Sequence, residues 1–179
     1  MKLKITIIIA LILLLTGSLF AEKKFTNFKL DDLKGKSVTL KKLLKDGPLV
    51  IDFWASWCAP CKKALPHLDE LDKKYKDIRV VAISIDKPRK KMAAKAIVKK
   101  NKYKFLTLFD TDQSISKKMG VNAIPHTFIV NKDGMVVFDF NSGKPGAEKV
   151  LEAEIQKLLG IEAVIEEPIQ APTEEAPAE

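Results

Sequence analysis

Short runs of β-branched and aromatic residues alternate along the chain with segments in which apolar residues recur every three or four positions. The runs predict strands, and the helical spacing predicts amphipathic helices. The predicted strands cover residues 25–30, 37–40, 50–54, 80–85 and 106–109, followed by a hairpin over residues 128–140. The predicted helices cover residues 58–75, 88–101, 112–119 and 146–159. This order indicates an α/β fold with a central sheet of mixed direction and helices on both faces.

Individual residues mark the ends of several of these elements. Pro88 suits a first helical turn, and Gly120 and Gly160 suit helix ends. The dipeptide Asp133-Gly134 is a strong signal for the turn of the hairpin. The apolar face of the last helix is expected to carry Val150, Leu151, Ile155, Leu158 and Leu159.

The N-terminal segment, residues 1–21, has the build of an export signal. Two lysines lie among the first four residues, and an almost wholly apolar stretch follows. The stretch ends by about Phe20, near the short end of the ~17–25 residues that a spanning helix needs, which favours a cleaved signal. Leu19 stands three residues before a cut after Ala21, where a small residue is preferred, so an uncleaved N-terminal anchor remains open.

The C-terminal segment, residues 161–179, holds six glutamates, three prolines and no basic residue. Such a composition cannot offset the entropy of ordering by burial, so this segment is expected to be a disordered tail. Residues 22–160 are enough for one domain with a proper core, and a second domain does not fit.

The chain is basic, with 31 Lys and Arg against 23 Asp and Glu, and the acidic tail leaves the folded part more basic still. The lysines are scattered and have no interleaved aromatic motif, and an exported protein meets little nucleic acid, so a nucleic-acid partner is not expected. A solvated cationic face and a weak attraction to anionic lipid headgroups both remain open. The domain is expected to be a monomer.

The chain has two cysteines, Cys58 and Cys61. Cys61 belongs to the apolar face of the helix predicted over residues 58–75, whereas Cys58 lies at its start, where unpaired backbone N–H groups favour an anion. A structural disulfide is the simplest reading for an exported protein. However, a bond across two intervening residues constrains the unfolded chain little, so thiol–disulfide exchange explains the pair better.

The segment Trp57-Cys58-Ala59-Pro60-Cys61-Lys62, after a strand that carries Asp52, resembles the thioredoxin active site. Ile124-Pro125 before a strand, the turn over residues 131–134 and the segment 110–121 resemble the extracytoplasmic TlpA/ResA branch. The resemblance covers residues 25–159. It implies a thioredoxin fold with an N-terminal β-hairpin and an insertion after the second strand of the core.

The resemblance implies a thiol–disulfide oxidoreductase with three catalytic residues. Cys58 would attack a substrate disulfide, Cys61 would resolve the mixed disulfide, and Asp52, buried with a raised pKa, would take the proton of Cys61. The alternative for Asp52 is a carboxylate that merely pairs with a lysine. ResA-like proteins carry a glutamate on the helix, where this chain has Ala64, so the proton acceptor here is thioredoxin-like.

The expected substrate-binding residues are Trp57, Ala59 and Pro60 around the disulfide, with Ile124 and Pro125 opposite. A cis Pro125 would turn the Ile124 backbone toward an extended substrate; an ordinary trans proline is the alternative. His126 could titrate near the site or be inert, and His67 is expected on the surface. No metal site is expected, because the two cysteines and one histidine lack a fourth ligand.

These features predict an exported oxidoreductase that reduces protein disulfides, in the periplasm or on the outer face of the cytoplasmic membrane. Its electrons would come from a membrane donor of the DsbD or CcdA type, and cytochrome c maturation is one candidate pathway. No cofactor beyond the redox-active disulfide is expected. An oxidase or isomerase, and a redox-silent binding module, are the alternatives.

Overall fold

The computed structural model describes residues 23–161. The predicted signal, residues 1–21, lies outside the described residues, as does the predicted tail apart from its exposed first residue, Ile161. Within residues 23–161, no helix has both the length and the apolar character needed to cross a membrane.

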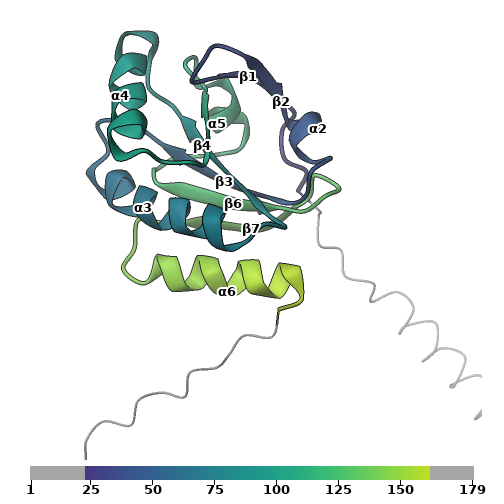
Figure 1. Ribbon diagram of the computed structural model, residues 1–179. Helices are drawn as coiled ribbons and strands as arrows, with labels where there is room; N and C mark the ends of the chain where they lie inside the picture. The colour runs from purple at the N-terminus through teal and green to yellow at the C-terminus, as the bar shows by residue number, and fades with distance from the viewer. Residues whose placement is uncertain (1–22, 162–179) are drawn as a thin grey trace, which may run out of the picture.

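Seven strands form one sheet in the order β2-β1-β5-β4-β3-β6-β7 (Figure 1). β3, β4 and β5 are parallel to one another, and the remaining pairings are antiparallel. The sheet is therefore mixed, as predicted. The strands are β1 (Lys29–Asp32), β2 (Ser37–Thr39), β3 (Leu49–Trp54), β4 (Arg79–Ser84), β5 (Leu106–Phe109), β6 (His126–Val130) and β7 (Val136–Asn141).

Helices cover both faces of the sheet. The side chains of α3, α4 and α6 join one buried cluster, and those of α2 and α5 join the cluster on the opposite face. The helices are α2 (Leu40–Leu43), α3 (Ala59–Lys74), α4 (Lys91–Asn101), α5 (Ser114–Lys118) and α6 (Ala147–Leu159). Figure 1 shows α3 and α6 side by side below the sheet. The predicted α/β architecture is confirmed.

The central strand β3 is buried along its whole length. Successive side chains of a strand point to opposite faces, so Val50, Asp52 and Trp54 share one face, and Val50 and Trp54 lie in the cluster formed with α3 and α6. The predicted core position of Trp54 is confirmed. Asp52 thus lies on an apolar face directly beneath two helices.

The insertion consists of α4 and β5, between β4 and α5. β5 pairs in parallel with β4 and antiparallel with β1. The N-terminal hairpin of β1 and β2 is therefore attached to the rest of the sheet through the inserted strand (Figure 1).

Several predicted bounds were wrong. The first strand begins at Lys29 rather than residue 25, because Phe25 and Phe28 are buried outside the sheet ladder, with Phe25 packing on Phe53 and Phe128. The second strand ends at Thr39, whose hydroxyl caps the unpredicted helix α2 by accepting from Lys42 N–H.

The predicted helices were also adjusted at their ends. Residues 88–90 form a 3₁₀ turn ahead of α4, and α5 is shorter than expected because Gln113 adopts a left-handed backbone conformation before it. Val150 was placed wrongly on the apolar face of α6. Its side chain is 48% exposed, while Leu151 and Ile155 are buried.

Candidate active site

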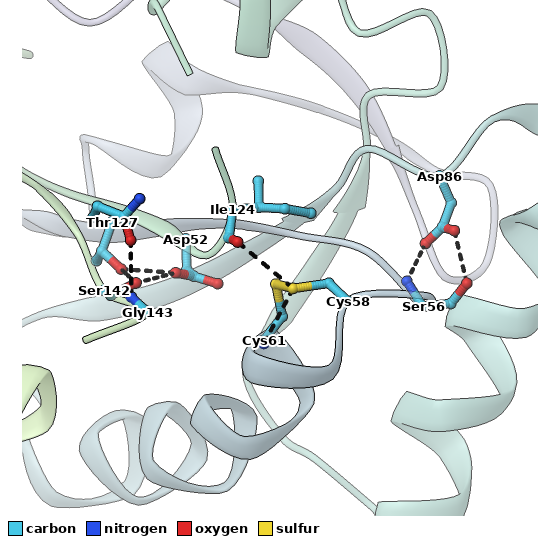
Figure 2. The surroundings of a disulfide bond; sticks show 10 residues. Asp52, Ser56, Cys58, Cys61, Asp86, Ile124, Thr127, Ser142 and Gly143 are labelled. Carbon is cyan, nitrogen blue, oxygen red and sulfur yellow. Dashed lines mark hydrogen bonds between the residues drawn. A yellow bond between two sulfur atoms is a disulfide. The ribbon is translucent and has the colours of Figure 1, made fainter. Parts of the chain in front are cut away.

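The two cysteines form a disulfide at the N-terminus of α3 (Figure 2). Cys58 is the N-cap residue, and its Sγ accepts a hydrogen bond from Cys61 N–H at 3.2 Å. Cys61 is fully buried and Cys58 is 5% exposed. The predicted order of accessibility is therefore confirmed, although Cys58 is less exposed than expected.

The loop before β6 explains the small exposed fraction of Cys58. The carbonyl oxygen of Ile124 lies 3.7 Å from Cys58 Sγ, as Figure 2 shows. The Ile124–Pro125 peptide bond is cis, so the predicted cis proline is confirmed and the trans alternative is wrong. Ser142 N–H donates to the carbonyl of Pro125 at 3.2 Å, so the end of β7 supports this loop.

Asp52 is buried between β6 and the helices on its face. Its Oδ1 accepts a hydrogen bond from Thr127 Oγ1 at 2.7 Å and a long one from Ser142 Oγ at 3.5 Å (Figure 2). Its Oδ2 has no hydrogen-bond partner among the described residues. Burial raises the pKa of Asp52 to about 7, an effect that the two hydroxyl donors partly oppose.

No lysine pairs with Asp52 within residues 23–161. The alternative of a lysine-paired carboxylate therefore has no support in the described part of the chain. A carboxyl group with a pKa near 7 is present both as acid and as base at neutral pH, which suits it to proton transfer.

Sequence reasoning missed the hydroxyl groups that hold Asp52. Thr127 lies directly opposite Asp52 in the register of β3 and β6, so a correct strand alignment would have found it. Ser142 is 90 residues from Asp52 along the chain. It follows β7 at a bend, and nothing in its local sequence distinguishes it from a surface serine.

A second buried carboxylate, Asp86, fixes the loop on the other side of the disulfide. Asp86 accepts hydrogen bonds from Ser56 N–H and Ser56 Oγ, both at 2.7 Å (Figure 2). It also accepts one from Ser84 Oγ at 2.9 Å. The loop that leads to Trp57 is thereby tied to the end of β4. Sequence reasoning also missed this contact.

The predicted substrate-binding residues surround Cys58. Trp57 is 56% exposed, and Ala59 and Pro60 are also exposed. Ile124 is half-buried and Pro125 is buried. A groove of about 560 Å³ begins at Trp57 and is bordered on its far side by the basic turn at residues 87–90. The five residues are thus placed together, but their role in binding stays a prediction.

The two histidines differ in their surroundings. His126 Nε2 lies 2.6 Å from Asp139 Oδ1, a contact that holds its ring on β7. His67 is not the surface residue that was expected, because its side chain is only 23% exposed and its Nε2 is buried without a partner among the described residues. Residues 23–161 contain no cluster of three or more His, Cys, Asp or Glu that could hold a metal ion.

Comparisons with known proteins agree with the geometry. The model of the Redoxin family matches residues 20–155. Thiol-disulfide oxidoreductase ResA of Bacillus anthracis is 38% identical over 115 residues, which are 64% of this chain and 66%, just under two thirds, of that relative. ResA of Bacillus thuringiensis subsp. konkukian is 34% identical over 136 residues, 76% of this chain and 77% of the relative.

Solved structures give the same result. A putative thiol:disulfide interchange protein DsbE from Chlorobium tepidum has a TM-score of 0.71 and 28% identity, covering 78% of this chain and 97% of that one. StoA from Bacillus subtilis has a TM-score of 0.59 at 22% identity, covering 72% of this chain and 96% of that one, a likeness that concerns the fold alone. The expected thioredoxin fold of the TlpA/ResA branch is confirmed.

Proposed function

The chain belongs to the redoxin family and has ResA-like thiol–disulfide oxidoreductases among its relatives, and we propose that it is an exported enzyme that reduces protein disulfides. The observation that carries the proposal is the disulfide at the N-terminus of α3, which faces the Ile124 carbonyl ahead of a cis proline. Cys58 keeps 5% of its surface exposed, whereas Cys61 is fully buried. Such an arrangement suits exchange with an outside disulfide.

In the first step, reduced Cys58 attacks as a thiolate. The bond between one substrate sulfur and Cys58 forms, the substrate S–S bond breaks, and the other substrate sulfur leaves as a thiolate. The N-terminus of α3 and the Cys61 N–H favour the anion on Cys58. Lys62 and Lys63, both exposed near the start of α3, add positive charge.

In the second step, Cys61 resolves the mixed disulfide. Asp52 takes the Cys61 proton, the Cys61 thiolate attacks Cys58 Sγ, and the remaining substrate sulfur leaves as a thiolate. Burial disfavours the Cys61 thiolate, so a nearby base is needed. With a pKa of about 7, much of Asp52 is ionised at neutral pH, and the carboxylate still binds a proton strongly. Asp52 can therefore act as the base for Cys61.

The exposed surface around Cys58 supports a polypeptide substrate. Backbone groups of Ile124 can pair with an extended substrate strand, as in other cases where an extended peptide binds along a backbone edge. Trp57, Ala59 and Pro60 add apolar surface next to the reacting sulfur. A protein disulfide in an accessible, extended segment is the substrate that fits this site best.

The direction of the reaction is proposed from the residues between the cysteines. Ala59 and Pro60 supply no histidine to stabilise the Cys58 thiolate, so the disulfide form is not strongly oxidising. The protein would act as a reductant supplied by a membrane donor of the DsbD or CcdA type. Cytochrome c maturation is a candidate pathway, although Ala64 replaces the ResA-type glutamate.

The reduction potential of the pair tests this direction. Equilibration with glutathione buffers, read by alkylation and mass, should give a potential nearer the about −270 mV of thioredoxin than the about −120 mV of DsbA. Pro60→His is the matched variant, because it introduces the missing thiolate-stabilising group and should shift the potential upward. A wild-type value near that of DsbA would show an oxidase, and no exchange at all would show a redox-silent module.

Export is proposed from the first 21 residues, which carry two lysines before an apolar stretch. When the full chain is expressed in a bacterial host, most of the protein should be recovered outside the cytoplasm as a species that begins near Glu22. Intact mass and N-terminal sequencing of the soluble and membrane fractions check this. Recovery of membrane-bound protein that retains Met1 would show an N-terminal anchor instead.

A further inference from the structure

A small cavity lies between Asp52 and the surface of the protein. It has room for about one water molecule, with a volume of about 10 Å³. Asp52 and Ser142 line its inner side, Ala64 and His67 line it from α3, and Glu148 lines it from α6. The cavity therefore connects the buried carboxyl group to the gap between the two helices.

Two polar atoms of the residues that line this cavity are buried and unpaired within the described part of the chain, Asp52 Oδ2 and His67 Nε2. An unpaired buried polar atom costs about 1–3 kcal/mol, so two of them beside one cavity call for a common explanation. A water in the cavity can hydrogen-bond to both groups, with further partners in the Ser142 and Thr127 hydroxyl groups.

The other ring nitrogen of His67, Nδ1, lies beside an exposed side chain. His67 Nδ1 lies 3.9 Å from Glu70 Oε2, and the Glu70 side chain is 76% exposed. The imidazole ring thus has one nitrogen in the interior and one beside an exposed carboxylate. Histidine is the side chain best suited to pass a proton between two such nitrogens near neutral pH.

We propose that His67 carries the proton of Asp52 between the cavity and solvent. The inference rests on the proposed function, in which Asp52 is the base for Cys61. After Cys61 has given its proton to Asp52 and attacked Cys58 Sγ, the proton on Asp52 passes to the cavity water. The water gives a proton to His67 Nε2, and His67 Nδ1 releases one to solvent, so that no net charge accumulates on the path.

Acidic side chains lie at the outer end of this path. Glu70 on the same helix and Glu148 on α6 are exposed, and Glu148 lines the cavity. On the inner side, among residues 23–161, Asp52 is the only titratable group that lines the cavity. The path therefore runs from one buried carboxyl group to exposed carboxylates at the protein surface.

Chemical rescue tests the proposal. In weak buffer at pH 7, with dithiothreitol as electron source and insulin as substrate, His67→Ala should lower turnover about tenfold, below the 10²–10⁴-fold of a direct acid–base group. Added imidazole should restore the rate in proportion to its concentration, because it reaches the shortened side chain and carries the proton. Sodium chloride at equal ionic strength should not.

Two further variants complete the test. His67→Gln keeps a hydrogen-bonding side chain but cannot relay a proton, so it should be slow, and it serves if His67→Ala fails to fold. His126→Ala removes the histidine that does not line the cavity, and it should show no response to imidazole. Wild-type-like turnover of both His67 variants, or equal rescue of His126→Ala, would overturn the proposal, whereas an inactive wild type would instead overturn the proposed function.

Discussion

Replacement of Cys58 by serine is expected to abolish disulfide exchange, with a loss of turnover of at least about 10³-fold, because the one remaining thiol, that of Cys61, is fully buried. Cys61→Ser should be just as inactive in turnover but for a different reason. Its Cys58 still attacks, and the mixed disulfide then persists because the resolving thiol is gone. Non-reducing gels and intact mass of the proteins trapped in the host compartment check both results.

Alkylation of the reduced protein gives the control for this pair of variants. Cys58 is 5% exposed and Cys61 is fully buried, so a neutral-pH pulse of iodoacetamide should modify Cys58 well before Cys61. The two serine variants have nearly the same volume and should unfold at similar denaturant concentrations. Trapping by Cys58→Ser, or equal labelling of the two thiols, would contradict the assigned roles.

Asp52→Asn is expected to slow the enzyme and stabilise its fold at the same time. Loss of the base should lower the rate of the resolving step by about 10²-fold or more, while attack by Cys58 is little changed. The folded-state pKa of Asp52 is raised from 3.8 to about 7, so its protonated form favours the folded state. The stabilisation that comes from the protonated Asp52 carboxyl group is therefore present at low pH and is lost as pH rises from about 4 through about 7.

The size of this effect on the free energy of unfolding follows from the raised pKa of Asp52. A raised pKa of this size corresponds to about 4 kcal/mol lost between pH 4 and pH 8. Denaturant unfolding of the oxidised protein at pH 4 and pH 8 measures it. The variant should show a much flatter dependence, with a gain on the order of 2–4 kcal/mol at pH 8 after allowance for a buried amide.

Asp69 offers a matched control with the opposite sign. It is also buried, yet the Lys104 N–H and Lys73 outweigh burial and hold the pKa of Asp69 below its usual value. Asp69→Asn should therefore destabilise the protein at pH 8 and leave the resolving step unchanged. If Asp52→Asn behaved like Asp69→Asn, the proton-acceptor role would have to pass to water.

The parts of the structure that sequence reasoning placed correctly depend on local patterns. The buried strand around Asp52 and the helix that Cys58 caps each carry their signal within a few residues, and the cis proline followed from the resemblance to thioredoxin-like proteins. The roles of these residues in catalysis and binding stay predictions until the variants are measured. The errors have physical causes as well: Phe25 resembles a strand residue in sequence, but its ring is used to fill a core against Phe53 and Phe128.

The contacts that sequence reasoning missed join distant segments. Ser142 reaches Asp52 across 90 positions, and Asp86 reaches Ser56 across 30. His67 looked like a surface residue because its position along α3 gives no sign that its side chain would line a cavity beside α6. Such contacts depend on how complete elements pack, and periodicity within one element does not contain that information.

The hydrogen bonds between Ser56 and Asp86 hold the loop before the disulfide in place independently of the turn at residues 87–90. The groove beside Trp57 is bordered by residues 87–90, a turn at the start of the inserted segment, whereas the groups around Asp52 come from β6, α3, α6 and the end of β7. Because the buried Asp86 anchors the loop before that turn begins, the turn can vary in charge and length without moving the disulfide. If the groove binds substrate as proposed, substitutions in this turn should therefore change partner choice and leave the reactivity of the disulfide unchanged.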